Sequence, residues 1–214
     1  MSEADPTRRR IRQLVDEHPV LLFMKGERAA PRCGFSASVV GLLDQLVPDY
    51  ATADVLSDPA LREGIKEFSE WPTIPQLYVR GEFVGGCDIV NELFASGELH
   101  ALLGAPAGSE SAPRIELTPD AAEVLAEGLA RAGDAGVLRL LVDARYRARI
   151  VVAPADPRDF AVACRGVTLH VDPLSAARAE EAQIDVERTR RGPRLKVLLP
   201  KASADTIQGA QPSA

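Results

Sequence analysis

Cys33 is the residue of this chain best placed to do chemistry. It follows an apolar run at 20–25 that predicts a strand, and it directly precedes a helical pattern, within the sequence Pro-Arg-Cys-Gly-Phe-Ser at 31–36. A cysteine at the start of a helix has its sulfur near unpaired backbone N–H groups and the positive end of the helix dipole, which stabilise the thiolate. Lys25 and Arg32 add positive charge nearby in the sequence. These features predict a reactive thiol, and the alternative is a packed cysteine without a role.

Ser36 stands three positions after Cys33, where a second thiol would be needed to close a disulfide within the motif. A thiolate without a resolving partner has two chemical outlets. It forms a mixed disulfide with another thiol, or it binds a soft metal centre. The motif therefore predicts one of these two chemistries.

Periodicity predicts the elements that position these residues. Residues 1–104 show a βαβαββα order, and Asp58 followed by Pro59 is typical of a helix start. The expected elements are a first helix with an apolar face at Ile11, Leu14 and Val15, a strand at 20–25, a helix from near Gly34, a strand at 50–55, a helix after Asp58, a hairpin of 76–79 and 82–84, a helix from near Asp88 and a short helix ending near Leu103.

The composition limits the class of protein. The chain has 214 residues, a formal net charge of −6 and three widely spaced cysteines, Cys33, Cys87 and Cys164. This is no disulfide framework and indicates a reducing compartment, so we expect a cytoplasmic protein. The acidic charge disfavours non-specific nucleic-acid binding. No apolar run approaches the roughly 20 residues of a membrane helix, and residues 1–13 lack the apolar core of a signal peptide.

The two halves of the chain differ. Residues 1–104 hold 10 Lys and Arg against 16 Asp and Glu, a net charge of −6, whereas residues 105–214 hold 15 of each. Residues 105–114 lack periodicity and predict a linker. Residues 115–200 predict a smaller α+β domain with a mostly antiparallel sheet, and the polar tail 201–214 is expected to be disordered. The elements expected in the domain 115–200 are a helix from Thr118-Pro119-Asp120 and strands at 137–142, 149–152, 160–163, 167–171, 184–187 and 195–199.

Four sequence blocks, in order and with matching spacing, resemble the monothiol glutaredoxins of the Cys-Gly-Phe-Ser type. The resemblance covers about Thr7 to Gly104 and implies an α/β thioredoxin-like fold for residues 1–104. The seven residues between Lys25 and Cys33 are similar to the longer loop of this class. The blocks are 23–26, 31–36, 71–79, which begins Trp71-Pro72-Thr73-Ile74-Pro75, and 81–90, which contains Gly85-Gly86-Cys87-Asp88.

The resemblance implies a glutathione site. It places Lys25 and Arg62 on the carboxylate at the glycine end of glutathione, and Asp88 near the γ-glutamyl amine beside the backbone of Cys87. It also implies a cis peptide after Ile74 that would expose the backbone of Ile74 to the tripeptide. Each charge alone is better interpreted as a solvated surface group, but the set matches the charges of glutathione, which favours the binding site. Whether the Cys87 sulfur is reactive stays open, and Cys164 is expected to be a packed strand thiol.

In the resembled family, a [2Fe–2S] cluster is held between two subunits by one cysteine of each and by two glutathiones. The resemblance therefore implies Cys33 as the metal ligand, a homodimer when the cluster is bound, and delivery to client iron–sulfur apoproteins. A BolA-like partner is a further expectation. The rival hypothesis is an enzyme that reduces glutathione mixed disulfides through Cys33, with turnover that is weak. A third hypothesis is that the second domain is an adaptor that binds client proteins.

The second half resembles A-type (HesB-like) iron–sulfur carriers at 115–122, 166–175 and 184–187. Those carriers bind iron through three cysteines. This chain has Asp143–Arg147 where the first belongs and no cysteine after Cys164, so the carrier activity does not follow. A docking or dimerisation module is expected instead, and a coincidental match is the alternative. Arg145, Arg147 and Arg149 alternate, so they are predicted to share one face of a strand, either as a basic docking surface or as a solvated face.

Overall fold

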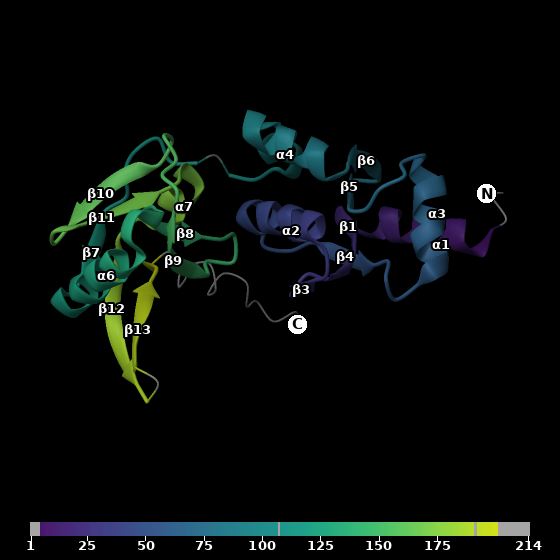
Figure 1. Cartoon of the computed structure of the whole chain (residues 1–214). Helices are drawn as coiled ribbons and strands as arrows, with labels where there is room; N and C mark the ends of the chain where they lie inside the picture. Colours follow the sequence, from purple (N-terminus) through teal and green to yellow (C-terminus); the bar gives the residue numbers. More distant parts are fainter. Residues whose placement is uncertain (1–4, 107, 191, 201–214) are drawn as a thin grey trace, which may run out of the picture. The chain divides into compact units, whose positions relative to one another are not determined.

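The computed structural model describes residues 5–106, 108–190 and 192–200, which fall into two compact units, Met1–Pro106 and Ala107–Ala214 (Figure 1). Helix α5 ends at Leu103 and strand β7 begins at Ile115, so the described residues between them form neither helix nor strand. The predicted disordered tail lies outside the described residues. Among those that are described, no helix is long and apolar enough to cross a membrane.

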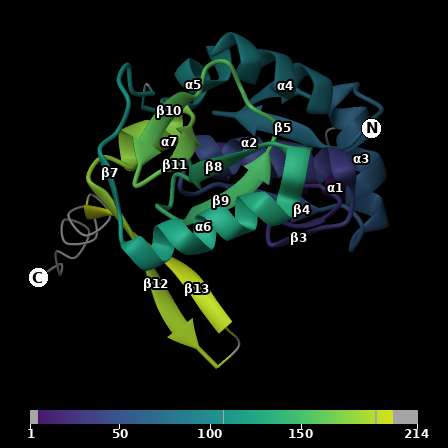
Figure 2. The same cartoon turned by 60° about the vertical axis from the view of Figure 1, so that its left-hand side comes forward.

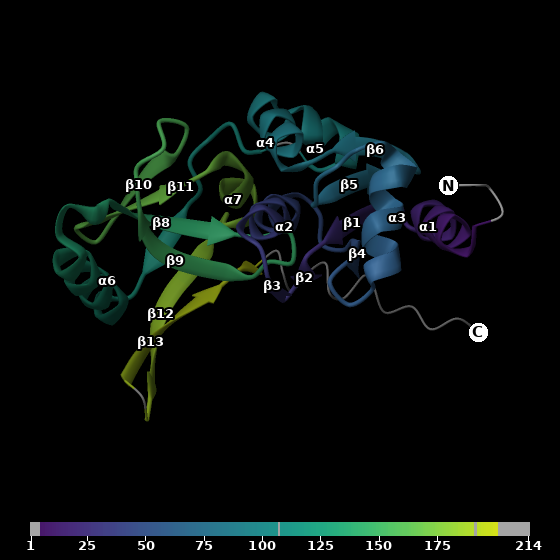
Figure 3. The same cartoon turned by 45° about the vertical axis from the view of Figure 1, so that its right-hand side comes forward.

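The first unit is built on a four-stranded sheet in the order β4-β1-β5-β6. β1 runs parallel to β4 and antiparallel to β5, and β6 is antiparallel to β5. Helices α1 and α3 lie on one side of the sheet, and α2 and α4 lie on the other (Figure 3). This is the predicted thioredoxin-like fold. The elements are α1 (Pro6–Glu17), β1 (Val20–Met24), α2 (Gly34–Leu46), β4 (Ala51–Asp54), α3 (Pro59–Ser69), β5 (Gln76–Val79), β6 (Glu82–Gly85), α4 (Cys87–Ser96) and α5 (Glu98–Leu103).

Local signals explain where these elements begin. Asp58 is the N-cap of α3 and accepts a hydrogen bond from the Leu61 N–H at 3.0 Å, as its sequence predicts. The apolar face of α1 places Ile11 and Val15 in the core together with the buried strand β1. The sequence reading missed the short hairpin of β2 (Gly26–Glu27) and β3 (Ala30–Pro31), which lies between β1 and Cys33.

The second unit has the predicted α+β class, and its strands form two mixed sheets (Figure 2). Among the described residues of this unit, three of the five strand pairs are antiparallel, while β11 with β8 and β12 with β7 are parallel. All six predicted strands are present, but β7 and α7 were missed because they have only three and six residues. The elements are β7 (Ile115–Leu117), α6 (Pro119–Ala132), the 3₁₀ turn Gly133–Ala135, β8 (Val137–Val142), β9 (Ala148–Ala153), β10 (Phe160–Cys164), β11 (Val167–Val171), α7 (Pro173–Arg178), β12 (Ala182–Thr189) and β13 (Gly192–Leu198).

The prediction that the arginines at 145–149 share one face of a strand is wrong. Only Arg149 lies in a strand, because residues 143–147 form the turn between β8 and β9. Asp143 closes this turn: its Oδ1 accepts from the N–H groups of Arg145 at 2.9 Å and Arg147 at 2.8 Å. The Arg147 guanidinium also donates to Asp143 at 2.7 Å. Arg145 and Arg147 therefore do not share a strand face with Arg149.

Candidate functional site

Cys33 is the N-cap residue of α2, with extended backbone angles (φ −154°, ψ 135°) and a half-buried side chain. The pKa of its thiol is lowered, chiefly by the backbone N–H of Ser36 and further by the Phe35 N–H, the Lys25 charge and the Ser36 hydroxyl. Burial acts in the opposite direction. The thiolate is thus stabilised by the first turn of a helix and one nearby cation, as the sequence predicted.

Ser36 does more than leave the motif without a second thiol. Its side chain is fully buried, and its Oγ accepts a hydrogen bond from the Lys25 N–H at 3.2 Å. The Lys25 carbonyl in turn accepts from the Arg32 N–H at 2.9 Å. The hydroxyl therefore ties the end of β1 to the helix that begins after Cys33.

We expect Cys33 to be alkylated with a midpoint below the ordinary thiol value of 9.0, because its pKa is lowered in the folded chain. The sign follows from linkage: the folded state favours the thiolate, so this contribution to stability is present at high pH and is lost as the pH falls through the folded pKa. The measurement is the pH dependence of iodoacetamide labelling at the Cys33 peptide, followed by mass spectrometry. The same peptide in the denatured chain is the control, and an equal or higher midpoint in the folded chain would refute the activation.

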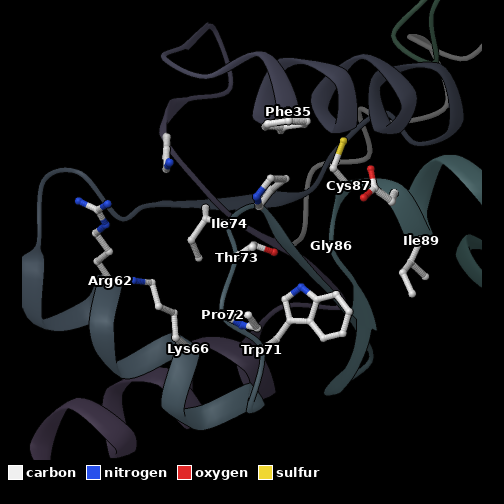
Figure 4. A pocket seen from close by; sticks show the side chains of 13 residues that line it. Phe35, Arg62, Lys66, Trp71, Pro72, Thr73, Ile74, Gly86, Cys87 and Ile89 are labelled. Atoms are coloured by element: carbon white, nitrogen blue, oxygen red, sulfur yellow. The ribbon is translucent and has the colours of Figure 1, made fainter.

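A cavity of about 340 Å³ opens beside this helix start (Figure 4). The structure brings five of the six predicted site residues into its lining. Cys33 itself is not part of the lining, but Phe35 and Lys25, which both lower the pKa of its thiol, are. The full lining is Lys25, Phe35, Arg62, Lys66, Trp71, Pro72, Thr73, Ile74, Pro75, Gly86, Cys87, Asp88 and Ile89.

The cavity has charged groups of opposite sign on different elements. Arg62 and Lys66 reach it from α3, and Asp88 lies in the first turn of α4. Figure 4 shows Arg62 and Lys66 on one side and Cys87 on the other. Both α3 cations lie near Glu63, with Lys66 Nζ 3.0 Å and Arg62 Nε 3.9 Å from its carboxylate. Lys66 is consequently the more fully neutralised of the two.

The loop 71–75 forms another wall of the cavity. The Ile74–Pro75 peptide is cis, as the family resemblance implied. Buried Gln76 fixes the loop, because its Nε2 donates to the carbonyls of Trp71 at 2.9 Å and Thr73 at 3.2 Å. Trp71 packs against Phe83 with ring centroids 5.8 Å apart, and its buried Nε1 has no hydrogen-bond partner among the described residues. Trp71 is therefore both a packing residue and part of the cavity wall.

Gly86 lets the start of α4 approach this wall, because a Cβ there would lie 3.0 Å from Trp71 Nε1, and Gly85 lets the preceding strand approach α4 itself. Gly85 has φ +154°, and a Cβ there would lie 2.6 Å from the Ile89 Cβ. We therefore expect Gly85→Ala to destabilise the chain by about 1–3 kcal/mol in urea unfolding, through overpacking and backbone strain. Gly41→Ala is the control, because Gly41 is helical with open space around it, and that change should stabilise by about 0.5–1 kcal/mol. Equal unfolding midpoints for wild type and Gly85→Ala would refute the close approach.

The other two thiols differ in their surroundings. The Cys87 sulfur, at the start of α4, accepts a hydrogen bond from Asn91 Nδ2 at 3.3 Å. The Cys164 sulfur donates to the Ile115 carbonyl at 3.2 Å, and burial raises the pKa of its thiol. Cys164 is part of the second unit, where it packs against the apolar core. No group of three or more His, Cys, Asp or Glu side chains within the described ranges could hold a metal ion.

Sequence reasoning did not select Lys66, Phe35 or Ile89 as site residues. Lys66 follows Arg62 by four positions on α3, so helical spacing alone puts both on one side of the helix and could have identified it. Phe35 is 62% exposed and Ile89 is 37% exposed, both unusually high for large apolar side chains. Their exposure depends on tertiary structure and has no sequence signal.

A thioredoxin-like sheet with one activated thiol and no second cysteine in its motif defines the class of monothiol thioredoxin-fold proteins. Comparison with known proteins gives the family. Residues 20–84 match the family described as Glutaredoxin. An uncharacterized monothiol glutaredoxin, ycf64-like, of Synechocystis is 55% identical over 97 residues, which are 45% of this chain and 91% of that protein. The chain belongs to the monothiol glutaredoxin family through its first unit.

Two further similarities were found. Monothiol glutaredoxin-S11 of Oryza sativa subsp. japonica is 46% identical over 125 residues, 56% of this chain and 26% of that protein, so the chain matches about a quarter of that relative's length. The solution structure of a monomeric truncated mutant of Trypanosoma brucei 1-C-Grx1 is 41% identical and covers 45% of this chain and 88% of that chain, with a TM-score of 0.43.

Proposed function

We propose that the first unit binds glutathione and, as a homodimer, carries a [2Fe–2S] cluster that it stores or delivers to client apoproteins. The observation that carries the proposal is the single activated Cys33 thiol beside a cavity with cations on one side and a carboxylate on the other. The cluster is the cargo in this proposal, and glutathione is the partner that would complete its ligands.

The cavity fits the chemistry of glutathione. This tripeptide has two carboxylates and one ammonium, so it needs cations and an anion at separate places. Lys25 and Arg62 are suited to a carboxylate, and Asp88 to the amine. The backbone at Ile74 offers polar groups to a peptide in the cavity. The volume of about 340 Å³ is at the lower end of the range typical of small-molecule sites.

The thiol arrangement fits a shared cluster. Iron–sulfur clusters are held by four thiolates, and this motif provides one per chain. Two chains and two glutathiones would supply the four. The apolar side chains of Phe35 and Ile89 at the cavity are exposed in the single chain, and a second copy would cover such groups.

The test is reconstitution of the purified chain with ferrous iron and sulfide under anaerobic conditions, with and without glutathione. A visible absorption and circular dichroism spectrum of a [2Fe–2S] cluster is expected only with glutathione. The same spectrum at the same yield without any low-molecular-weight thiol would contradict the proposal.

The rival function is a glutathione-dependent oxidoreductase that removes glutathione from mixed disulfides. The lowered pKa of Cys33 favours it, because a thiolate attacks disulfides. We expect weak turnover in a glutathione-linked disulfide-reduction assay, because Ser36 cannot resolve a mixed disulfide. Robust turnover that disappears in Cys33→Ser would replace the carrier function by the enzymatic one.

The second unit is proposed to be a degenerate A-type-carrier-like module that docks clients, a BolA-like partner or another copy. Support comes from the sequence blocks at 115–122 and 166–175, together with the lack of cysteine after Cys164. Deleting residues beyond Gly104 would then leave cluster binding intact and slow cluster transfer to a client.

A further inference from the structure

Arg28 occupies an unusual position for an arginine. With Ala29 it forms the turn between β2 and β3, and such hairpin tips are normally solvated. Its side chain is nevertheless only 16% exposed. The guanidinium Nε donates to Asp44 Oδ1 at 2.8 Å, Nη2 donates to the same oxygen, and its carbon lies 3.9 Å from the centroid of the Tyr50 ring.

The groups that hold Arg28 come from two other elements. Asp44 lies in the last turn of α2, and buried Tyr50 directly precedes β4. The Tyr50 hydroxyl donates to the same Asp44 oxygen at 3.1 Å, so one carboxylate joins all three side chains. Arg28, Asp44 and Tyr50 are called the Arg28 clamp below. A planar guanidinium that is both hydrogen-bonded and stacked in this way is held in one orientation.

The base of the same hairpin lies at the thiol site. The Gly26 N–H donates to Asp54 Oδ1 at 2.8 Å, and the Arg32 N–H donates to the Lys25 carbonyl at 2.9 Å. Gly26 has φ +86°, and a Cβ there would lie 2.6 Å from the Ala30 carbonyl oxygen, so the two strands of the hairpin approach each other closely at this point. Lys25 and Cys33 therefore stand on either side of a segment whose tip is fastened by the Arg28 clamp.

We propose that the Arg28 clamp is a positioning device that sets Lys25 and Cys33 relative to each other and to the cavity. Arg28 does not act on the thiol through its own charge, because the groups that lower the Cys33 pKa are Ser36, Phe35 and Lys25. The clamp fastens the hairpin tip to the far end of α2, the helix that Cys33 begins. A displaced loop would move the Lys25 ammonium away from the thiolate, and small displacements of such groups have large effects on reactivity.

The test measures the iodoacetamide labelling rate of Cys33 at neutral pH in Arg28→Ala, Asp44→Ala and the double variant of the full chain. We expect labelling to slow by about threefold or more in each. Asp44→Ala is decisive, because removing a negative charge would speed labelling if the effect were simple electrostatics. The double variant should be no slower than the singles, because the three side chains act as one unit.

Glutathione affinity, measured by calorimetry without any cluster, should fall in the same variants. The affinity measurement rests on the proposed glutathione site, whereas thiol labelling does not. Loss of glutathione binding in the wild type would therefore refute that site and still leave the labelling rates as a test of the clamp. Val15→Ala is the control for stability alone, because Val15 is buried in the α1 core away from the clamp. It should unfold more easily with Cys33 labelling unchanged.

Arg28→Lys keeps the positive charge but loses the planar guanidinium with its several N–H donors. Cys33 should therefore be labelled more slowly in this variant than in the wild type. Faster or unchanged labelling in Asp44→Ala would overturn the proposal. An equal slowing in Val15→Ala would overturn it as well, because loss of stability would then explain the effect.

Discussion

Cys33→Ser is expected to abolish cluster binding in the first unit. Cys33 is the cysteine of the helix-start motif, its thiol has a lowered pKa, and a serine hydroxyl is not a ligand for a soft metal centre. Since each chain would contribute one of four thiolates, loss of this thiol removes half of the ligands of the dimer. Iron and acid-labile sulfide per chain after anaerobic reconstitution are the quantities to measure.

Cys164→Ser is the matched control for this experiment. The Cys164 sulfur donates to a backbone carbonyl in the other unit, and burial raises the pKa of its thiol. This variant should retain the iron and sulfide content of the wild type. Equal loss from both variants would remove Cys33 from the role of cluster ligand.

Lys25→Glu is expected to weaken glutathione binding by about tenfold or more. A charge-assisted hydrogen bond contributes roughly 1.5–3 kcal/mol, and reversal of the charge replaces attraction by repulsion. Arg62→Glu should have a smaller effect, because the Arg62 side chain is 44% exposed and already lies near Glu63. Affinity is measured by calorimetry with reduced glutathione and no metal.

Arg80→Glu is the control for the net charge of the unit. Arg80 lies in the turn between β5 and β6 and is not part of the cavity lining. It changes the charge by the same amount but should leave affinity close to that of the wild type. If Lys25→Glu and Arg80→Glu weaken binding equally, the effect is long-range and the cavity is not the glutathione site.

The first unit was predictable because its signals are local. The Asp58 cap, the apolar face of α1 and the apolar runs of β1 and β5 all depend on near neighbours in sequence. The site residues Lys25, Arg62, Ile74, Cys87 and Asp88 were selected through the family resemblance, and the structure gathers them in one cavity. Their roles toward glutathione stay predictions until binding is measured.

What the sequence did not reveal depends on tertiary packing or on single hydrogen-bonding side chains. The Arg28 clamp joins a hairpin tip to residues 16 and 22 positions further along the chain, which no local pattern indicates. The alternating arginines at 145–149 would share one face only in an extended strand, whereas residues 143–147 form a turn. Asp143 closes this turn by accepting three hydrogen bonds from Arg145 and Arg147.

Native mass spectrometry of the reconstituted protein tests the central proposal most directly. The intact assembly is expected to contain two chains, one [2Fe–2S] cluster and two glutathiones, because four thiolates are needed and each chain supplies Cys33 alone. Exhaustive removal of glutathione should release the cluster and return the mass to that of the free chain, 22.9 kDa. A cluster on a single chain, or a dimer that keeps its cluster without glutathione, would contradict the account.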